Sequence, residues 1–577
     1  MMSRYVPVVQ LAEVRPSTRG RWARPVVAPD EPDQTPAQWH RMLTLLADIS
    51  LFIGTRGVWS SAASHQLLVA GIISACYATI LVTGVLTLVV RRSRSLARLD
   101  LVVLATAVTL AYCAVSVAHD FSDESVLTTQ AAHQLLDGHA MYGQPWPWLF
   151  GGNIAYTATV TGGYDFSYGY PPLLAMLTAP LLWLGRGALP TTLVTTTAIA
   201  TGAIVMWKML PVPWRSAATM VCLGFGMIPT YARLGYPAVL ALAFLIPVVM
   251  RWTRMGTGGP ADWARAACLG AACASQQLPW FLTPFLLAGV YALRRGELGA
   301  RGAAVAVGRI AGTAAGTWLL INAYFIVTEP RTWIAGVALP IIQGAVIHGQ
   351  GLVDISLYFT DGSDRLAWYS HASMLLAAGL LAMFVLFVRR LGPAATVLPW
   401  CAFFLATRSQ DGYYLLMTPL WVAAAATVPP SAFATAWQPR LLHGRRTARM
   451  VLAGALLAPS LVAATVAATG GPPLRMEAVG ASRTTLTVKT LTVRVSNTGG
   501  SPLEPHFMVT TGQSMSRYWK VLSGPSTVAA HATATYRLQP PDGAWGLPKN
   551  GTRIRLRAFT PSPVTLSSQD IQVPSGN

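Results

Sequence analysis

The residues best suited to chemistry form an acidic cluster, His119-Asp120-Phe121-Ser122-Asp123-Glu124, directly after an apolar run. Carboxylates at the edge of a membrane segment are costly unless they are solvated or used. A carboxylate in such a place can accept a proton as a general base. The cluster also suits a helix start, because Ser122 or Asp123 can cap a helix over 124–137 and acids in its first turn favour the helix dipole. Both interpretations stay open on this motif alone.

The elements that position this cluster are membrane helices. The chain has 577 residues, of which 53% are hydrophobic and 11% charged, whereas soluble proteins have about 25% charged residues. Apolar runs of roughly 18 to 25 residues recur from Gln66 to Ala468, and about 20 such residues span a bilayer as a helix. We therefore predict a polytopic α-helical membrane protein with about 10 to 13 helices, broken or re-entrant ones included.

Basic residues set the expected orientation. The net charge of +20 comes from 42 Lys and Arg against 22 Asp and Glu, and much of the Arg lies in short loops between apolar runs. The positive-inside rule places these loops in the cytoplasm. They are Arg91–Arg98, Arg251–Arg265, Arg294–Arg301, Arg389–Arg390 and Arg440–Arg449. The exterior side then receives loops 119–169 and 328–371 and the C-terminus, and the Arg-, Ala- and Gly-rich composition suggests a bacterial plasma membrane.

Several predicted spans are irregular. The region before residue 91 has no clear topology, because the run 42–60 contains Asp48 and Arg56. One of the three apolar stretches near 189–209, 216–232 and 235–250 should be broken or re-entrant. The stretch 266–293 has basic residues at both ends and a polar, Pro-broken centre at 275–280, so we predict a helical hairpin that points into a site.

Four regions follow from these patterns. Residues 1–40 read as a disordered N-terminal tail, 41–98 as an N-terminal membrane region, 99–470 as the main membrane domain and 471–577 as an extracytoplasmic domain. From 484 onward, short segments with period-two alternation are bounded by turn residues, which predicts an immunoglobulin-like β-sandwich. That domain either caps the membrane part or binds sugar through Tyr518, Trp519, Tyr536 or Trp545.

The cysteines and the loop aromatics have simpler expected roles. All six cysteines lie in apolar runs without a CxxC pattern, so we expect no metal site and no cofactor. Residues 126–136 form a short apolar face that suits a helix lying flat on the membrane. Most aromatic residues of 141–170 suit an interfacial belt.

Five segments together resemble a known family. They are an acid followed by Leu135-Leu136-Asp137-Gly138 and Tyr142; Tyr170-Pro171-Pro172-Leu173-Leu174; Ser275-Gln276-Gln277-Leu278-Pro279-Trp280; and Thr407-Arg408-Ser409-Gln410-Asp411-Gly412-Tyr413-Tyr414, with Gly349-Gln350-Gly351 between the last two. Their order over 99–428 resembles the GT-C membrane glycosyltransferases, and most closely the bacterial members of glycosyltransferase family 87. The Lys that relatives carry near 275–280 is replaced here by Gln276 or Gln277.

The resemblance implies roles for individual residues. Asp123 would be the catalytic base, with Asp120 second and Glu124 third. Arg408 would bind the phosphate of the donor, followed by Arg331, His348 and Gln277. These three residues also have simpler structural interpretations. Arg331 suits a local ion pair after Glu329-Pro330, and His348 suits an interfacial loop. Gln277 suits a turn that only satisfies the hydrogen bonds of its own backbone. Contacts to sugar or lipid would come from Tyr142, Asp165, Tyr170, Trp280 and Tyr413.

The family resemblance implies a hexosyltransferase, mannosyltransferase-like, that moves a sugar from a polyprenyl-phosphate donor to a glycan, glycolipid or protein acceptor outside the cell. Such a reaction needs a general base and stabilisation of the departing phosphate but no metal, and no nucleic acid is expected as a partner. A transporter or flippase of lipid-linked sugars is an alternative, although it needs ionisable groups near mid-membrane. A non-catalytic scaffold for envelope assembly is a second alternative.

Overall fold

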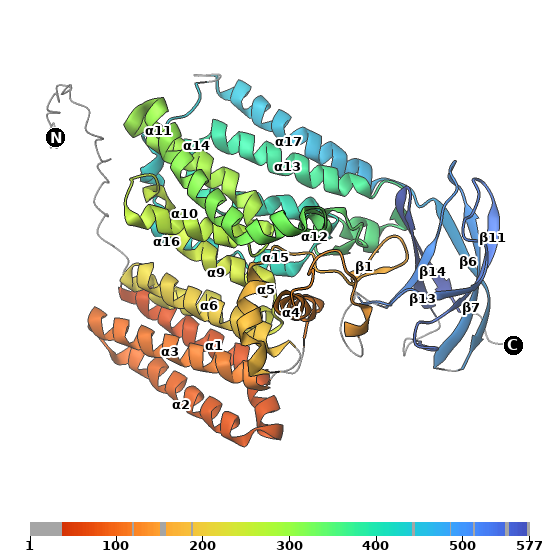
Figure 1. The fold of residues 1–577 in the computed structure, drawn as a ribbon, viewed down its shortest axis with the longest axis horizontal. Helices are drawn as coiled ribbons and strands as arrows, with labels where there is room; N and C mark the ends of the chain where they lie inside the picture. Colours follow the sequence, from red (N-terminus) through yellow and green to blue (C-terminus); the bar gives the residue numbers. More distant parts are fainter. Residues whose placement is uncertain are drawn as a thin grey trace, which may run out of the picture.

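The computed structural model describes residues 37–117, 121–150, 157–185, 188–440, 445–484, 486–511, 514–547 and 553–573. The predicted tail 1–40 therefore lies almost entirely outside the described residues, and so do His119 and Asp120. Figure 1 shows the helices lying side by side and the strands of the C-terminal region forming a separate body at one end of them. A mostly helical protein with a C-terminal β-rich region is what the sequence predicts.

Three long helices form the first bundle: α1 (Ala37–His65), α2 (Leu67–Val89) and α3 (Ser93–Val117). Two polar side chains of α1, His40 and Asp48, have partners on the neighbouring helices. His40 Nε2 lies 2.7 Å from Asp100 Oδ2, and Thr83 Oγ1 donates to Asp48 Oδ1 over 3.1 Å. Ionisable groups inside membrane bundles are tolerated when they face one another in this way. The run 42–60, which left the topology unclear in the sequence, is part of the continuous helix α1.

The next group of elements contains the expected break. It comprises α6 (Leu189–Met209), η3 (Val212–Trp214), α7 (Arg215–Leu223), α8 (Met227–Arg233) and α9 (Pro237–Val249). The break falls in the second apolar stretch, where Phe225 and Gly226 have φ angles of 54° and 75°. Gly54 of α1 packs so closely here that a Cβ on it would lie 2.3 Å from Gly226 N. Glycine at position 54 therefore lets α1 approach the broken segment.

The polar hairpin centre of the sequence is a turn between two helices. Residues 274–277 separate α10 (Pro260–Cys273) from α11 (Leu278–Thr328). The 3-10 turn η4 (Trp252–Arg254) precedes α10. The α11 backbone leaves the helical conformation at Gly299, which has φ 71° and ψ 177°. Glycine adopts this conformation without steric cost. The element thus consists of two helical segments that meet at the basic cluster 294–301.

The remaining helical elements include two long helices, α13 and α17, and several short segments. They are α12 (Pro330–Ile342), η5 (Ile355–Phe359), α13 (Ala367–Leu386), α14 (Val388–Leu391), η6 (Gly392–Ala394), η7 (Leu398–Leu405), α15 (Asp411–Leu415), α16 (Thr418–Thr427), η8 (Pro430–Phe433) and α17 (Arg446–Ala468). Residues 392–405 do not form a regular α-helix: η6 and η7 are 3-10 segments, and each has a proline at its second position. Proline lacks the N–H that a continuing α-helix would use.

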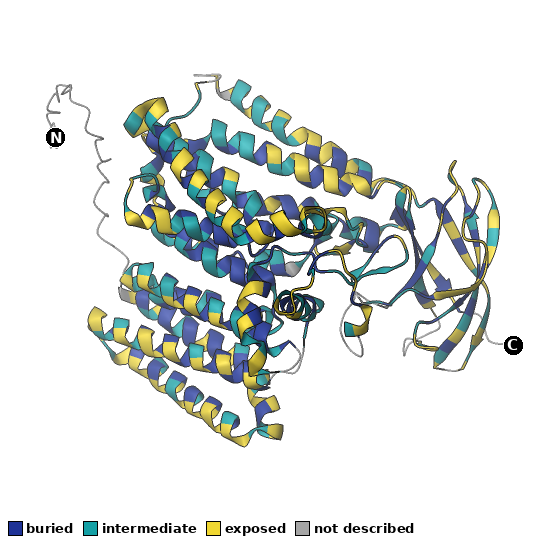
Figure 2. Cartoon of the chain, in the orientation of Figure 1, coloured by how far each residue is buried: buried dark blue, intermediate teal, exposed yellow. Residues whose placement is uncertain are grey.

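Seven helices in the described part of the chain are long and apolar enough to cross a membrane: Gln38–His65, α2, α3, α6, α11, α13 and Thr447–Ala468. Their outer faces carry exposed apolar side chains, such as Leu81 of α2 and Leu320 of α11, which are 64% and 78% exposed. Figure 2 shows these exposed faces on the outer helices and buried stripes between helices. Apolar surface of this extent suits contact with lipid.

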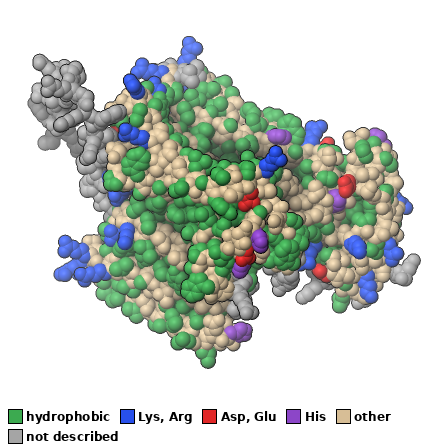
Figure 3. All heavy atoms as spheres, in the orientation of Figure 1, with side chains coloured by type: hydrophobic (Ala, Val, Ile, Leu, Met, Phe, Trp, Pro, Cys, Tyr) green, Lys and Arg blue, Asp and Glu red, His purple; other side chains and the backbone are tan. Residues whose placement is uncertain are grey.

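In Figure 3, Lys and Arg side chains gather at the end of the helices away from the sandwich, and again on the sandwich itself.

The segment between α3 and α6 packs on itself. It contains α4 (Asp123–Leu136), η1 (Pro147–Leu149), β1 (Thr157–Ala158), β2 (Tyr164–Asp165), α5 (Leu173–Thr178) and η2 (Ala179–Leu184). Leu127 and Ala131 of α4 are buried in one cluster with Tyr142, Trp146 and Tyr168. The expected membrane-facing helix and aromatic belt are therefore wrong for these residues, because the loop aromatics cover the apolar face of α4.

The C-terminal domain consists of two antiparallel sheets. One contains β6 (Leu474–Arg483), β7 (Thr487–Asn497), β10 (Lys520–Ser523), β11 (Thr533–Gln539) and β12 (Trp545–Gly546). The other contains β8 (His506–Thr511), β9 (Ser514–Met515), β13 (Arg553–Pro561), β14 (Val564–Gln572) and β4 (Gly362–Ser363). Alternate residues of β7, such as Leu491 and Val493, share one buried core with Leu556 of β13. Alternating burial on facing sheets is the packing of a β-sandwich.

The sandwich is joined to the helical part by main-chain pairing. Strand β4 belongs to the segment before α13, yet it pairs with β14 with Leu566 opposite Ser363. Arg557 of β13 is fully buried and donates to the carbonyl of Leu357 over 2.7 Å. The second sheet therefore includes a strand of the predicted exterior loop 328–371, and the two regions form one continuous structure.

Candidate functional site

A cavity of about 760 Å³ lies where the helices meet the sandwich. Its polar wall comes from the start of α4, the loop through β1 and β2, and the segment 406–413. Its apolar wall comes from α11 and α13, with Phe281, Phe285, Met374 and Leu381 among the lining side chains. Val564 of the sandwich completes the rim. Cavities that combine a largely apolar wall with a few convergent polar groups are the usual ligand sites of proteins.

The carboxylates Asp123 and Glu124 form the first turn of α4 and line this cavity. The residue that caps the helix is Ser122, whose Oγ accepts from Ser125 N over 3.1 Å, and Ser125 Oγ accepts from Ser122 N over 3.2 Å. The backbone start of the helix is thus satisfied by the two serines. The cap and the acidic pair are separate features of one motif, so the two carboxylates remain available to the cavity.

Hydrogen bonds fix Asp123 more fully than Glu124. Asp123 Oδ1 accepts from Glu124 N over 2.9 Å, and Asp123 Oδ2 accepts from Thr157 Oγ1 over 3.2 Å. Glu124 is hydrogen-bonded by the hydroxyl of Tyr170, but its Oε2 is buried without a hydrogen-bond partner. A buried carboxyl oxygen without a partner is costly and calls for an explanation. Its position at the cavity makes a ligand the natural partner.

The two carboxyl groups have different protonation tendencies. Burial raises the pKa of Asp123, and the Glu124 backbone N–H, the Arg408 charge and the Thr157 hydroxyl oppose that rise. Burial, with the Asp123 charge added, raises the pKa of Glu124 to about 8 against the opposing Tyr170 hydrogen bond and Arg408 charge. Two adjacent carboxyls in one site cannot both ionise easily. At neutral pH Glu124, with a pKa of about 8, therefore holds its proton.

Arg408 brings positive charge to the same wall. It lies in β5 (Arg408–Ser409), which pairs in parallel with β3 (His348–Gly349). A Cβ on Gly349, which has φ 133°, would lie 2.2 Å from Ser409 O, so the pairing needs glycine. With its amide oriented to satisfy both neighbours, Gln343 bridges two site residues: its nitrogen donates to Asp165 Oδ2 over 2.5 Å and its oxygen accepts from Arg408 Nη1 over 3.2 Å. Arg408 Nε is buried without a hydrogen-bond partner, which leaves it a donor for a ligand.

Some of the residues predicted to contact sugar or lipid line the cavity, and one of them lies behind the lining. Tyr170, Trp280 and Tyr413 line the cavity, together with Asp165. Tyr142 is buried behind them and donates its hydroxyl proton to the Tyr170 carbonyl over 2.9 Å. The structure therefore places Tyr142 as a support for Tyr170 rather than at the cavity.

The glutamines of the turn between α10 and α11 have different environments. Gln277 lines the cavity, but its amide nitrogen donates to the carbonyls of Gly169 and Val337 over 3.0 and 2.8 Å. Both amide protons are used, so Gln277 fixes the turn and does not offer them to a phosphate. Gln276 also lines the cavity, and its Oε1 is buried without a hydrogen-bond partner. Of the two, Gln276 is the one with an unsatisfied polar atom.

Two predicted phosphate ligands lie away from the cavity lining. Arg331 is exposed in the first turn of α12. His348 is exposed, and its place is fixed by pairing in register with Arg408 in the β3–β5 ladder. Asp120 lies outside the described residues. The structure thus brings together Asp123, Glu124, Asp165, Tyr170, Gln277, Trp280, Arg408 and Tyr413.

Sequence reasoning missed three contributors to the site. Thr157 and Gln343 hold Asp123 and Arg408, and Val564 reaches the rim from the C-terminal domain. Gln343 had a weak signal, since it is a polar residue at the end of the apolar segment 333–342. Thr157 and Val564 had none, because ordinary loop and strand residues reach the site only through the fold.

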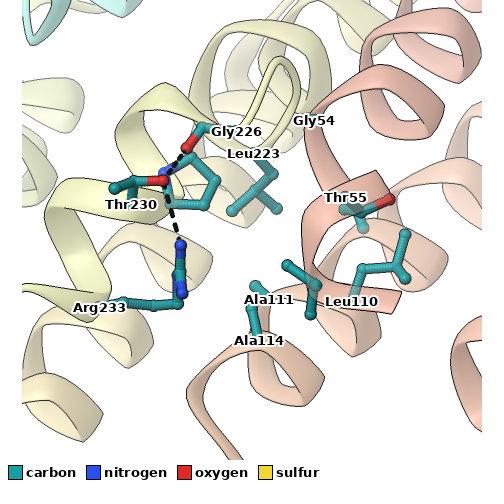
Figure 4. A pocket seen from close by; sticks show the side chains of 12 residues that line it. Gly54, Thr55, Leu110, Ala111, Ala114, Leu223, Gly226, Thr230 and Arg233 are labelled. Atoms are coloured by element: carbon teal, nitrogen blue, oxygen red, sulfur yellow. Dashed lines mark hydrogen bonds between the residues drawn. The ribbon is translucent and has the colours of Figure 1, made fainter. Parts of the chain in front are cut away.

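A second crevice lies between α1, α3 and α8 and is lined by Gly54, Thr55, Leu110, Arg233 and neighbours. Its volume is about 20 Å³, which has room for a single water molecule. Figure 4 shows that Thr230 links the Gly226 carbonyl and the Arg233 guanidinium there, by contacts of 2.5 and 3.3 Å. The crevice is too small for an organic substrate.

Two further observations bear on the class of site. Within the described ranges, no group of three or more His, Cys, Asp and Glu side chains is placed to hold a metal ion. No family model matches the chain, and searches of curated proteins and of solved structures gave no match. The site's own geometry is therefore the basis for a function.

Proposed function

We propose that this chain is a membrane glycosyltransferase of the GT-C type that moves a hexose from a polyprenyl-phosphate donor to an acceptor outside the cell. One observation carries the proposal: an acidic pair and an arginine face one cavity whose other wall is an apolar surface of two membrane helices. A lipid-linked sugar needs all of these parts. The family resemblance of the sequence supports the same class of enzyme. We also propose that the β-sandwich has the immunoglobulin-like fold.

The donor would lie along the cavity with its lipid on the apolar wall. Phe281, Pro284 and Phe285 of α11 line this part of the cavity together with Met374, Ala378 and Leu381 of α13. Apolar side chains on both sides suit a prenyl chain, which gains from leaving water. The phosphate then falls beside Arg408, whose guanidinium can donate from Nε. Charge-assisted hydrogen bonds of this kind are strong and suit phosphate oxygens.

Asp123 is the proposed general base. The acceptor hydroxyl attacks the anomeric carbon and gives its proton to Asp123, and the bond from that carbon to the phosphate oxygen breaks. The new glycosidic bond forms as polyprenyl phosphate leaves, with its charge stabilised by Arg408. Thr157 and the Glu124 backbone N–H hold the base, and the protonated Glu124 limits the negative charge near the departing phosphate. A positioned base contributes about 10² to 10⁴ in rate.

The arrangement of acids favours a transferase over a transporter. Asp48 and Asp100 lie inside the first bundle, but neither lines the large cavity, and Asp100 is engaged by His40 and Thr44. A transporter would need ionisable groups on its mid-membrane path. The proposed orientation puts the basic clusters inside the cell and the cavity rim and sandwich outside.

The test is sugar transfer by purified protein in lipid nanodiscs, with radiolabelled polyprenyl-phosphate hexose and a membrane-extract acceptor fraction. Wild type should move the label to the acceptor and release polyprenyl phosphate in equal amount. Asp123→Asn should lower kcat by about a thousandfold. Asp137→Asn is the matched control, because Asp137 is exposed at the other end of the same helix. No transfer by wild type from mannose-, glucose-, galactose- or arabinose-bearing donors would reject the proposal.

A further inference from the structure

A two-stranded hairpin connects the acidic pair to the β-sandwich. Strands β1 and β2 pair antiparallel, with Thr157 opposite Asp165 and Ala158 opposite Tyr164. The paired residues at one end hold the site: Thr157 Oγ1 donates to Asp123 Oδ2, and Asp165 is linked through Gln343 to Arg408. The hairpin therefore contacts the base directly and the arginine through Gln343.

The other side of the hairpin is held by Tyr518 of the sandwich, in the segment between β9 and β10. The Tyr518 N–H donates to the Tyr164 hydroxyl over 2.8 Å, and the Tyr518 hydroxyl donates to the Thr159 carbonyl over 2.7 Å. The two tyrosine rings lie 5.9 Å apart between centroids. A two-stranded hairpin alone is marginal in water, and the Tyr518 contacts add to the main-chain bonds that join Ala158 and Val160 to residues 344–346.

The sandwich is fixed to the helices independently of this hairpin. Besides the β4–β14 pairing, Arg555 and Arg557 of β13 donate to the carbonyls of Thr360 and Leu357 over 2.6 and 2.7 Å. The Arg557 guanidinium also lies 5.1 Å from the centre of the Tyr358 ring. Tyr518 is thus presented from a surface that several other contacts hold in place.

We propose that the β-sandwich is a structural part of the catalytic site, and that Tyr518 is a positioning residue that holds the β1–β2 hairpin over Asp123 and Arg408. The sequence left Tyr518 open as a sugar-binding residue. Its hydroxyl proton is used on the Thr159 carbonyl, and its ring packs between Tyr164 and His506, which lies 5.9 Å away. The hairpin contact therefore accounts for the features that made it a candidate. The catalytic consequence rests on the proposed function, but the mechanical link does not.

Hydrogen–deuterium exchange tests the link without an enzyme assay. Tyr518→Phe removes the bond to Thr159, and amides in the hairpin segment 157–167 should then exchange about fivefold faster, as expected for one ordinary hydrogen bond. Amides of β7 and β11 should keep their wild-type rates. Tyr536→Phe is the matched control, because Tyr536 is a buried tyrosine of the same domain whose hydroxyl has no hydrogen-bond partner.

A second variant and a second readout make the test decisive. Tyr164→Phe removes the hydroxyl that accepts from the Tyr518 N–H, and it should raise hairpin exchange in the same way. In the transfer assay, Tyr518→Phe should lower kcat about fivefold and leave the KM for donor within twofold. Because the Thr157 hydrogen bond lowers the pKa of Asp123, a loosened hairpin should also move the acidic limb of the pH–rate profile to higher pH.

The outcomes separate the two proposals. Unchanged hairpin exchange in both Tyr518→Phe and Tyr164→Phe overturns the positioning role. Equal changes in Tyr536→Phe overturn it too, because they indicate a general loosening of the sandwich. Faster hairpin exchange in a protein that transfers no sugar supports the link between domain and hairpin and rejects the glycosyltransferase proposal.

Discussion

The buried acid Asp100 in the first helical bundle and the acidic pair at the cavity differ in how completely the polar atoms around them are satisfied. Asp100, in the first helical bundle, accepts hydrogen bonds from His40 over 2.7 Å, from Thr44 over 2.8 Å and from Ser216. At the cavity, Glu124 Oε2, Arg408 Nε and Gln276 Oε1 are buried without hydrogen-bond partners. A network in which every polar group is hydrogen-bonded stabilises a fold, whereas polar groups without partners around a cavity are suited to bind a ligand.

Asp48 shows why the cavity matters as much as the missing partner. One of its oxygens accepts from Thr83, and the other is buried without a hydrogen-bond partner. Asp48 lines neither of the two cavities described above. An unsatisfied oxygen that no ligand can reach is only a cost to stability. The polar groups near Asp123 differ from Asp48 because they both lack hydrogen-bond partners and line a cavity that a ligand can enter.

The largest expected difference between the two clusters is catalytic. Arg408→Gln should lower kcat for sugar transfer by about a hundredfold or more, because it removes the charge that stabilises the departing phosphate. Arg331→Gln is the matched control: it makes the same change at an exposed arginine outside the cavity lining and should stay within threefold. Steady-state kinetics of both variants against donor concentration would decide this. Equal losses would mean that the guanidinium of Arg408 has no special part in the reaction.

The reverse pattern is expected in the helical bundle. Asp100→Ala leaves His40, Thr44 and Ser216 without their shared acceptor, and breaking a buried pair in this way costs about 3 to 5 kcal/mol. The melting temperature in detergent should fall by several degrees, while kcat per folded molecule stays within twofold. Asp137→Ala, at an exposed carboxylate, should leave the melting temperature unchanged. A large loss of kcat at full thermal stability in Asp100→Ala would show that the bundle cluster takes part in the function.

A smaller effect concerns pH and the two carboxyls of the cavity. The pKa of Glu124 is raised from 4.5 to about 8, so the folded state holds this proton where the unfolded state has lost it. Stability from Glu124 is then fully present below pH 4.5 and is lost as the pH rises toward about 8. Activity should also fall above about pH 8 as a second charge appears beside Asp123.

Glu124→Gln, which imitates the protonated form, separates these effects. The variant should keep wild-type activity near pH 7 within about threefold and lose the alkaline fall. Its melting temperature should exceed that of wild type at pH 8.5 and match it at pH 4. Thermal melts and transfer rates across this pH range provide the measurement. An alkaline fall that persists in the variant would assign it to another group.

The sequence predicted the features that depend on local patterns. Apolar runs located most of the membrane-length helices, period-two alternation located the strands of the sandwich, and Pro279 within a polar stretch located the turn at 274–277. Asp123, Glu124 and Arg408 were all candidates, and the structure places them at one cavity. Their roles in catalysis remain proposals.

What the sequence missed depends on partners far away along the chain. The topology of the first helix was unclear from the sequence because the partners of His40 and Asp48, which are Asp100 and Thr83, lie 60 and 35 residues away. The aromatic loop read as a membrane belt because nothing local shows that it covers α4. Thr157, Gln343 and Tyr518 enter the site through contacts between separate elements, which composition and spacing do not reveal.

The most direct measurement of the central claim is a single turnover with donor already bound. Wild type and Asp123→Asn in nanodiscs would be loaded with labelled polyprenyl-phosphate hexose and mixed with acceptor, and bound donor and product would be followed together. The account predicts that Asp123→Asn binds donor with a Kd within threefold of wild type and that transfer slows by about a thousandfold. Transfer at the wild-type rate from the bound donor in Asp123→Asn would contradict it.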